Sequence, residues 1–203
     1  MENLPGSTSS EETQSATSDK KKDSRSIVHD AFDIVELIAI AFGIIILISA
    51  FFFRQSVVSG NSMLSTLHDQ ERLIISNFMY EPKTGDIIVC QLTPAQEKTS
   101  PNISRKEALI KRVIAIEGQR VKIENGYVYV DGNKIEENYV FRDGMDSILN
   151  MPEITVSDNH IFIMGDHRNN SHDSRNFGEV DSRLVIGRAI FRIFPLEKLG
   201  NIK

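Results

Sequence analysis

An apolar segment near the N-terminus limits the architectures open to this chain. Leu37 to Phe53 contain no charged side chain over 17 consecutive residues. As a helix rising about 1.5 Å per residue, this segment is roughly 26 Å long, at the lower end of what spans a bilayer. A core helix in a soluble domain usually keeps a polar stripe, which is absent here. The segment therefore predicts a membrane-spanning helix.

A cleaved signal peptide is the main alternative for this segment. The polar region in front of it is unusually long, and the apolar run is longer than a usual signal core. Bulky Phe51, Phe52 and Phe53 stand where small residues should precede a cleavage site. We therefore expect an uncleaved anchor over residues 31–54.

Charges on either side of the anchor predict its orientation. Lys20, Lys21, Lys22 and Arg25 precede it, whereas Arg54 and Arg72 are the basic residues that soon follow. By the positive-inside rule, the N-terminus is cytoplasmic and the protein is a single-pass membrane protein. Residues 1–30 then form a cytoplasmic tail, disordered because it is almost without apolar residues. Residues 55–203 form one extracytoplasmic domain.

The segment after the anchor has the pattern of a mainly β, antiparallel domain. Short β-branched and aromatic runs alternate with turn-forming pairs, and Asn-Gly between two such runs is a strong hairpin signal. The turns are Thr84-Gly85-Asp86, Asn125-Gly126, Asp131-Gly132 and Asp143-Gly144. The predicted strands are Arg72–Ile75, Ile87–Val89, Val121–Ile123, Tyr127–Val130, Ile161–Met164 and Leu184–Phe194. Thr93 to Arg105 is polar, contains two prolines and is predicted to be a surface loop.

Composition narrows the function further. A net charge of -5 argues against a nucleic-acid partner, which favours basic surface. The single cysteine, Cys90, excludes an intrachain disulfide. It follows an apolar run, so we expect it to pack in a strand rather than act as a thiol nucleophile.

A first candidate segment for chemistry follows the anchor, from Val58 to Leu67. Here a strand is expected to end at Gly60, and Ser62 follows in a turn. A serine nucleophile needs a presented hydroxyl and backbone N–H donors for the oxyanion, and such a turn can supply both. By itself, Gly-x-Ser is more often only a turn.

A second candidate segment, Ala108 to Gly118, places a lysine in an apolar strand. With period-2 alternation, Lys111 shares a face with Leu109, Val113 and Ala115. It is either a lysine that extends to solvent from an edge strand or a buried, neutral amine that serves as a base. Arg112 faces the other way and, as a permanent cation, is expected to be structural.

A third candidate segment, Met164 to Gly178, is dense in acidic, basic and hydroxyl side chains directly after an apolar strand. Carboxylates and guanidiniums at this density can lock a loop through bidentate hydrogen bonds. Three other interpretations remain: a metal site on His167 and His172, a Ser-His-Asp triad with His167 as base, and a plain surface loop. No ligand motif accompanies the histidines, so we expect no metal and no cofactor.

Together these segments resemble the type I signal peptidases, in order, in spacing and in the preceding membrane span. The family pattern around the nucleophile, Gly-x-Ser-Met-x-Pro-Thr-Leu, corresponds to Gly60-Asn61-Ser62-Met63-Leu64-Ser65-Thr66-Leu67. The family's lysine segment corresponds to Lys111-Arg112-Val113-Ile114 and Gly118, and Gly85-Asp86-Ile87-Ile88-Val89 resembles a shorter motif. The last motif corresponds to Gly165-Asp166-His167-Arg168, Ser171-His172-Asp173-Ser174-Arg175, Phe177 and Gly178.

The resemblance implies a role for each matched residue. Ser62 is the nucleophile, Lys111 its general base, and the Ser62 N–H part of the oxyanion hole, in a turn that Gly60 begins. Ser171 orients the lysine amine. The residues implied to brace the site are Asp166, Arg168, Asp173 and Arg175.

The resemblance also implies the reaction and the substrates. Family members are serine endopeptidases that cut secretory precursors after a small residue at position -1, with another small residue at -3. Membrane lipid is the expected neighbour, and the oligomeric state is not predicted. The chain lacks the long insertion of larger members, so it resembles the compact, Gram-positive-like branch. It departs from the family at Ser65, usually proline, at His167, usually asparagine, and at Glu117 and Gln119.

Two other functions are compatible with parts of this pattern. A self-cleaving Ser-Lys domain of the repressor type shares a mainly β fold, but the membrane span and the lack of a DNA-binding helical domain argue against it. An anchored binding domain whose dyad has decayed would retain the fold without activity.

Overall fold

The computed structural model describes residues 11–98, 108–141 and 150–202, with side chains described from residue 29 onward. The chain divides into two compact units, Met1–Phe51 and Phe52–Lys203. The turn predicted at Asp143-Gly144 lies outside the described residues.

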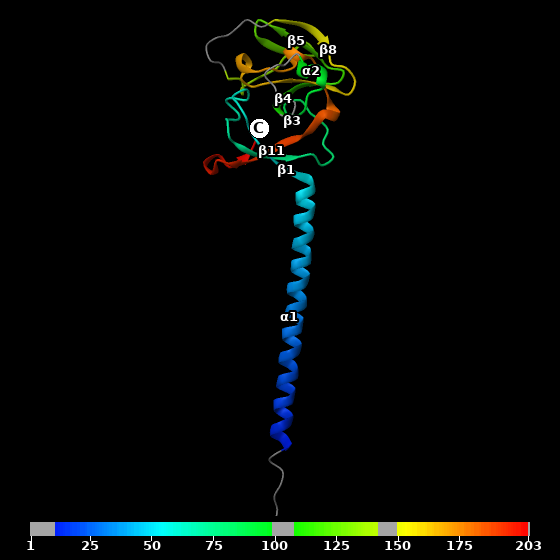
Figure 1. Ribbon diagram of the computed structural model, residues 1–203, viewed down its shortest axis with the longest axis vertical. Helices are drawn as coiled ribbons and strands as arrows, with labels where there is room; N and C mark the ends of the chain where they lie inside the picture. Colours follow the sequence, from blue (N-terminus) through cyan, green and yellow to red (C-terminus); the bar gives the residue numbers. More distant parts are fainter. Residues whose placement is uncertain (1–10, 99–107, 142–149, 203) are drawn as a thin grey trace, which may run out of the picture. The chain divides into compact units, whose positions relative to one another are not determined.

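The first unit is dominated by helix α1 (Glu11–Phe52). Its part His29–Phe52 is 24 residues long, contains an 18-residue window with a mean hydropathy of 2.8, and is long and apolar enough to cross a membrane. The apolar segment is thus helical as expected, and the chain passes into a strand at Phe53. Residues 11–30 continue the same helix (Figure 1). The disorder of the tail stays a prediction.

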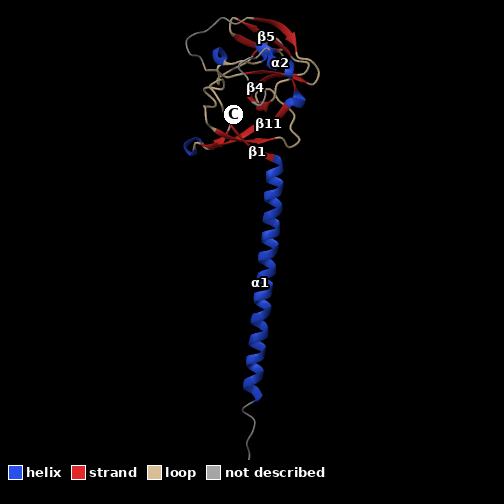
Figure 2. Cartoon of the chain, viewed as in Figure 1, coloured by secondary structure: helices blue, strands red, loops and turns tan. Residues whose placement is uncertain are grey.

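The second unit is mainly β and antiparallel, as predicted (Figure 2). One sheet has the strand order β1-β2-β11-β3-β4-β9-β10, with β12 paired to β11. Its strands are β1 (Phe53–Val57), β2 (Arg72–Ser76), β3 (Ile87–Cys90), β4 (Leu109–Ile116), β9 (His160–Met164), β10 (Val180–Asp181), β11 (Val185–Phe194) and β12 (Gly200–Asn201). A second sheet has the order β7-β6-β5-β8. Its strands are β5 (Arg120–Glu124), β6 (Tyr127–Val130), β7 (Asn133–Lys134) and β8 (Met151–Thr155).

The hairpins of the second sheet form at the predicted turns. Asn125 and Gly126 have φ of 52° and 76°, and Glu124 pairs with Tyr127 across the turn. Asp131 and Gly132 have φ of 51° and 80°. Two consecutive positive φ angles are what a tight type I′ hairpin requires, which explains the Asn-Gly and Asp-Gly pairs.

Short helices connect the strands. They are α2 (Pro94–Lys98), α3 (Ser174–Phe177) and the 3₁₀ turns η1 (Arg168–Asn170), η2 (Ser182–Leu184) and η3 (Leu196–Lys198). α2 corrects part of the prediction of a surface loop over Thr93 to Arg105, because Pro94–Lys98 are helical, although none of them is buried. Thr93 Oγ1 accepts a hydrogen bond from Gln96 N at 3.3 Å, and Pro94 occupies the first helical position, where its missing N–H costs nothing. Residues 99–107 of that loop lie outside the described part.

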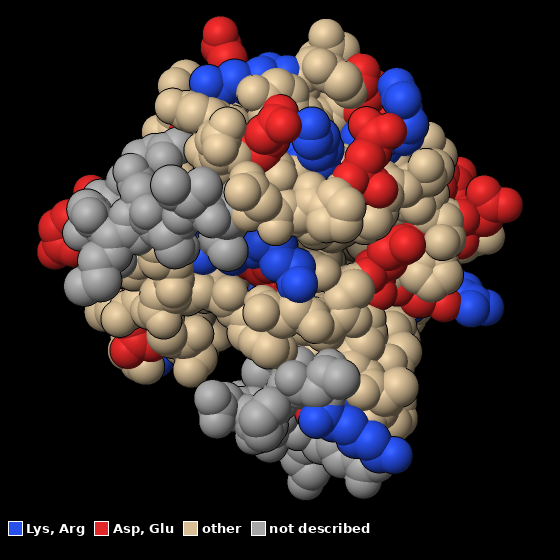
Figure 3. All heavy atoms as spheres, turned by 90° about the horizontal axis from the view of Figure 1, so that it is seen from above, with Lys and Arg blue, Asp and Glu red and all other residues tan. Residues whose placement is uncertain are grey.

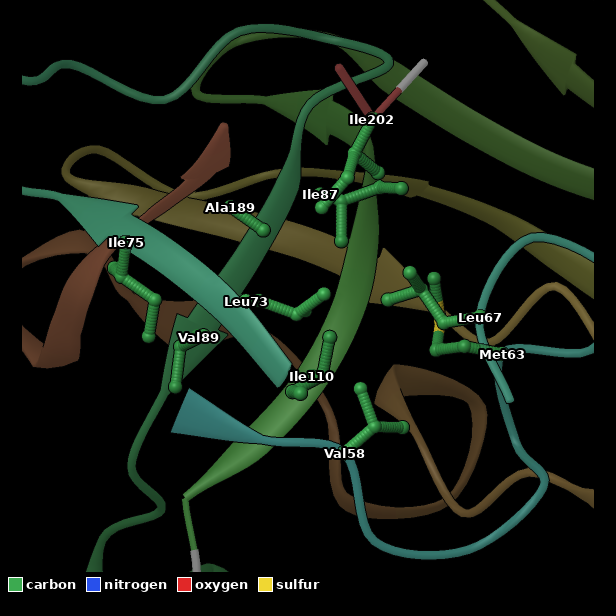
Figure 4. Packing of buried hydrophobic residues seen from close by; sticks show 10 residues of the cluster. All are labelled: Val58, Met63, Leu67, Leu73, Ile75, Ile87, Val89, Ile110, Ala189 and Ile202. Atoms are coloured by element: carbon green, nitrogen blue, oxygen red, sulfur yellow. The ribbon is translucent and has the colours of Figure 1, made fainter. Parts of the chain in front are cut away.

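The core supports the turn that carries Ser62. One buried cluster combines residues of β2, β3, β4 and β11 with Val58, Met63 and Leu67 from the segment after β1 (Figure 4). These three side chains are at most 2% exposed. Since Met63 and Leu67 flank the turn, their burial fixes it to the sheet. Cys90 is fully buried in β3, as predicted, and burial raises the pKa of its thiol to about 12.

Charges on the surface of the second unit are mixed in sign. On the face that Figure 3 shows, Lys and Arg side chains are interspersed with Asp and Glu side chains rather than separated from them. The net charge of -5 is therefore not gathered into one acidic patch on that face.

Candidate active site

The first element of the site is the turn that follows β1. Gly60 has φ of +83°, a conformation that L side chains rarely adopt, and its N–H donates to Asp69 Oδ1 at 2.8 Å. Leu67 N donates to Met63 O at 2.8 Å, so the chain makes a helical turn just after Ser62. With Met63 buried, half-buried Ser62 is presented at the edge of the turn.

Lys111 on β4 meets this turn. β4 lies between β3 and β9 in the sheet, and Lys111 is 4% exposed. Its Nζ lies 2.7 Å from Ser62 Oγ and 3.2 Å from Ile110 O. Of the two interpretations of this lysine, the structure supports the buried amine.

Burial lowers the pKa of Lys111, because desolvation disfavours its ammonium form. The nearby Asp173, Cys90 and Asp166 raise the pKa, and Arg175 lowers it, but burial prevails. Lys111 therefore has the electrostatic setting of a base that is usable closer to neutral pH than a solvent-exposed lysine.

The predicted alternation along β4 holds only in part. Leu109 and Val113 pack together in one buried cluster, on the face of Lys111, but Ala115 joins Ile114 in another. The pairing of β4 with β9 shifts register between Val113 and Ala115, and such an irregularity turns later side chains to the other face.

Arg112 forms a buried ion pair on the opposite face of β4. Its Nε and Nη2 lie 2.9 and 2.8 Å from the two carboxylate oxygens of Asp166, and its Nη1 donates to Gly85 O at 2.8 Å. Thr66 Oγ1 also donates to Asp166, at 2.5 Å. The bidentate pair joins β4, the loop after β9 and the Ser62 turn, in agreement with the structural role expected for Arg112.

A second buried ion pair shapes the loop from Gly165 to Gly178. Asp173 caps α3 and accepts hydrogen bonds from Arg175 Nε at 2.7 Å and from Gly165 N at 2.9 Å. Burial alone would raise the pKa of Asp173, but Arg175 and the Gly165 N–H outweigh it and lower the pKa. Arg175 Nη2 also donates to Arg168 O at 2.8 Å. The loop is therefore held by paired carboxylates and guanidiniums, as predicted.

Ser171 lies where this loop meets the Ser62 turn. A Cβ added to Gly165 would lie 2.3 Å from Ser171 Oγ and 2.5 Å from Ser62 O. Ser171 Oγ is buried, and although it lies near enough to Asp173 to help lower the pKa of that carboxyl, it has no hydrogen bond of acceptable geometry to a described residue. The structure thus places a buried hydroxyl close to the turn that carries Ser62.

The two histidines of the loop have separate surroundings. His167 is 8% exposed; its Nδ1 lies 3.2 Å from Asn61 O, and its backbone N donates to Ser62 O at 3.0 Å. His172 packs near Phe177, with ring centroids 5.6 Å apart. Within the described part of the chain, no three His, Cys, Asp or Glu side chains gather as metal ligands would.

A strap of residues that the sequence patterns did not single out covers the loop after β9. This strap is Glu137 to Phe141. Glu137 forms a bidentate ion pair with Arg168, the Tyr139 ring lies 3.9 Å from the Arg112 guanidinium, and Phe141 N donates to Asp166 O at 3.0 Å. None of the motifs matched to the family in the sequence includes these residues. Their sequence has only the pattern of an ordinary extended segment, so it gave no signal of a role at the site.

A cleft of about 360 Å³ opens beside Ser62 and Lys111. β1 and the Ser62 turn line one part of it, and the start of β4 lines another. Its lining residues are Ser56, Val57, Val58, Ser59, Gly60, Ser62, Met63, Ala108, Leu109, Ile110, Lys111 and His172. Since β1 is an edge strand of the sheet, an extended peptide could lie in this cleft along a strand edge.

Comparison with known proteins agrees with the resemblance seen in the motifs. A family model described as signal peptidase, peptidase S26, matches residues 31–194. A probable signal peptidase I-1 from Synechocystis sp. is 35% identical over 171 residues, which cover 83% of this chain and 85% of that protein. A signal peptidase I from Bacillus amyloliquefaciens is 30% identical over 197 residues, covering 92% and 99%.

A crystal structure of a signal peptidase I from Enterococcus faecalis V583 aligns with 54% of this chain and 97% of that one, at 23% identity and a TM-score of 0.44, and adds nothing to the assignment. The family model, by contrast, covers most of the chain, including the anchor segment and all three candidate segments. The chain therefore belongs to the signal peptidase family, peptidase S26.

Proposed function

We propose that Ser62 and Lys111 form the catalytic dyad with which this serine endopeptidase removes signal peptides from secreted precursors. The observation that carries the proposal is the 2.7 Å contact between Lys111 Nζ and Ser62 Oγ. At that distance the amine can accept the proton of the hydroxyl directly. Burial lowers the pKa of the lysine, and so favours the neutral amine that a base requires.

The reaction then follows from the geometry in two stages. Lys111 takes the proton of Ser62 Oγ as the oxygen attacks the scissile carbonyl, and the Ser62 N–H stabilises the oxyanion. Lys111 returns the proton to the departing amine, which leaves an ester on Ser62. Once that product has left, the Lys111 amine takes a proton from water as the hydroxide attacks the ester. Lys111 then returns this proton to Ser62 Oγ, which frees the hydroxyl and releases the signal peptide.

The residues around the dyad have supporting roles in this proposal. Gly60 permits the backbone conformation of the turn, and its own N–H is already donated to Asp69. Ser171 orients the lysine amine, and its buried hydroxyl near the Ser62 turn supports this. Asp166 supports the turn through Thr66, whereas Arg168, Asp173 and Arg175 hold the loop that carries Ser171.

The cleft supports the expected preference for small residues at -1 and -3. An extended substrate that pairs with the edge from Ser56 to Gly60 would turn alternate side chains toward the same wall. That wall is formed by Val58, Met63 and Ile110, each at most 8% exposed and packed in the core. Because these wall side chains are packed in the core and cannot move aside, the cleft has room only for small substrate side chains at -1 and -3.

The same proposal includes the membrane arrangement. Residues 1–30 are a cytoplasmic tail, residues 31–54 the anchor, and residues 55–203 the extracytoplasmic protease domain. A helix of sufficient length and hydropathy at His29–Phe52, together with the basic cluster in front of it, supports this. An anchor beside lipid places the protease near precursors that are themselves held in the bilayer, which raises their effective concentration.

The test is cleavage by the purified full-length protein in detergent. A precursor with alanine at -1 and -3 should be cut by the parent chain, and Ser62→Ala should be inactive while circular dichroism shows it folded. Ser76→Ala, on β2 and outside the cleft lining, is the matched control and should remain active. Substantial turnover by folded Ser62→Ala would rule out Ser62 as the nucleophile.

A further inference from the structure

A buried carboxylate that the dyad does not use lies at the base of the segment that carries Ser62. Glu71 is 2% exposed and immediately precedes β2. Its backbone oxygen accepts from Val58 N at 2.8 Å, and Gln70 N donates to Val58 O at 2.9 Å. These two bonds close the segment 58–71 into a loop. A buried carboxylate is costly unless it is paired, so the partners of Glu71 show what the loop is held against.

Arg192 of β11 is the main partner of Glu71. Its Nε lies 3.0 Å from Glu71 Oε2, an ion pair whose N–H is not aligned as a hydrogen bond. Lys198 Nζ and His68 Nδ1 lie 3.5 and 3.4 Å from the other carboxylate oxygen. The guanidinium of Arg192 is therefore the nearest charge that compensates Glu71.

The other end of the same guanidinium reaches the Ser62 turn. Arg192 Nη2 donates to Thr66 O at 2.7 Å, across 126 positions of sequence. The hydroxyl of the same threonine donates to Asp166 at 2.5 Å, and Asp166 is paired with Arg112, the neighbour of Lys111. Thr66 is thus held on its carbonyl by Arg192 of β11 and on its hydroxyl by Asp166 of the loop after β9, which is itself paired with Arg112 of β4.

We propose that Arg192 is a positioning residue of the protease, which joins the Glu71 carboxylate to the Thr66 carbonyl and so fixes Ser62 relative to Lys111. The proposal rests on the dyad proposed above. It requires the forked geometry of arginine, because a lysine ammonium is a compact charge that cannot span both acceptors from one position. Without the bond to the Thr66 carbonyl, buried Met63 and Leu67 would still attach the turn, but the Ser62 hydroxyl would be held less tightly relative to the amine, and small misplacements are costly in catalysis.

Arg192→Lys in the full-length protein tests the proposal, with Arg188→Lys as the matched control. Arg188 lies on the same strand, pairs with Asp86 at 3.1 Å and is 45% exposed. Activity is measured on a secretory precursor in detergent and normalised to the folded fraction from circular dichroism. Arg192→Lys should lower kcat about tenfold or more and leave KM within about twofold, whereas Arg188→Lys should change neither.

The pH dependence and a double variant separate positioning from a structural role. The rise of kcat with pH should keep its midpoint in Arg192→Lys, because the burial of Lys111 is unchanged and only its alignment with Ser62 is lost. Glu71→Gln should also lower kcat, and Arg192→Lys with Glu71→Gln should lose no more than the worse single variant, since the two residues act as a unit.

Each opposite outcome overturns the proposal. If folded Arg192→Lys has the kcat of Arg188→Lys, Arg192 is only structural, even where its unfolding midpoint is lower. If Glu71→Gln keeps full kcat, or the two losses multiply, the residues do not act together. Ser62→Ala, assayed alongside, distinguishes the two failures: an inactive Ser62→Ala with a fully active Arg192→Lys rejects the positioning role alone, and an active Ser62→Ala rejects the dyad together with all that rests on it.

Discussion

The amine of Lys111 lies 2.7 Å from the hydroxyl of Ser62, on a strand between two neighbours of the sheet. A charged lysine at this position would be poorly solvated, and the pKa of Lys111 is lowered mainly by that burial. If Lys111 is the base, as proposed, activity and stability make opposite demands on one side chain, because its burial also costs folding free energy.

Lys111→Met should be inactive and yet at least as stable as the parent chain near pH 7. In the unfolded chain Lys111 has an ordinary pKa, and so it binds its proton more tightly there than in the folded state, where its pKa is lowered. The folded parent therefore loses stability as the pH falls from the unfolded pKa toward the lowered folded pKa, and regains it as the pH rises. Methionine has a similar length and no proton to bind.

Denaturant melts of the two full-length proteins in detergent, at about pH 6 and about pH 9, measure this difference. The advantage of Lys111→Met should be larger at the lower pH. A variant that is less stable than the parent at both pH values, or that still cleaves precursor, would show that Lys111 is not the base.

The motif residues could be predicted from the sequence because each segment is local and ordered along the chain. The positions of Ser62, Lys111 and Asp173 within a turn, a strand and a loop follow from nearby residues. The contacts that hold them do not. Thr66 and Arg192 are 126 positions apart, and they meet only because β11 pairs with β2 in a particular register.

Two other features could not be predicted from local sequence patterns, for similar reasons. The register shift in β4, which separates Ala115 from Val113, depends on the pairing with β9. The packing of Tyr139 on Arg112 depends on where the second sheet returns to the first. A hydrophobic pattern reports which face of an element is buried, but it does not report which distant element covers it.

His167→Asn should be tolerated, with cleavage within roughly tenfold of the parent, or about 1.4 kcal/mol of barrier. The backbone N–H of residue 167 donates to Ser62 O and is kept in the variant, whereas the ring contacts with Phe141 and Asn61 O are lost. Initial rates on a secretory precursor measure the effect. A folded but inactive His167→Asn would revive the triad in which His167 is the base.

The orientation in the membrane can be measured with single cysteines, because buried Cys90 should not react with an impermeant thiol reagent. Lys203→Cys should be labelled in intact cells, since residues 55–203 are proposed to lie outside. Ser7→Cys should be labelled only after the membrane is permeabilised. The reverse pattern would contradict the predicted topology.

Gly165→Ala should inactivate the enzyme, because position 165 has no room for a Cβ. The added carbon would lie 2.3 Å from Ser171 Oγ and 2.5 Å from Ser62 O, and the second contact is with backbone that cannot rotate away. Relief requires the Ser62 turn to move away from the loop after β9, which would separate Ser62 from Lys111. We expect a loss of roughly 1–3 kcal/mol in unfolding free energy, as for overpacked cores, together with a larger loss in kcat than in KM. Ser171→Ala combined with Gly165→Ala removes only the Oγ contact, since Ser171 Cβ and Ser62 O both stay 2.5 Å from the added carbon, so it should not restore the rate. A folded Gly165→Ala with parental kcat would mean that the loop and the turn can separate without moving the dyad, and that their close approach does not hold the site together.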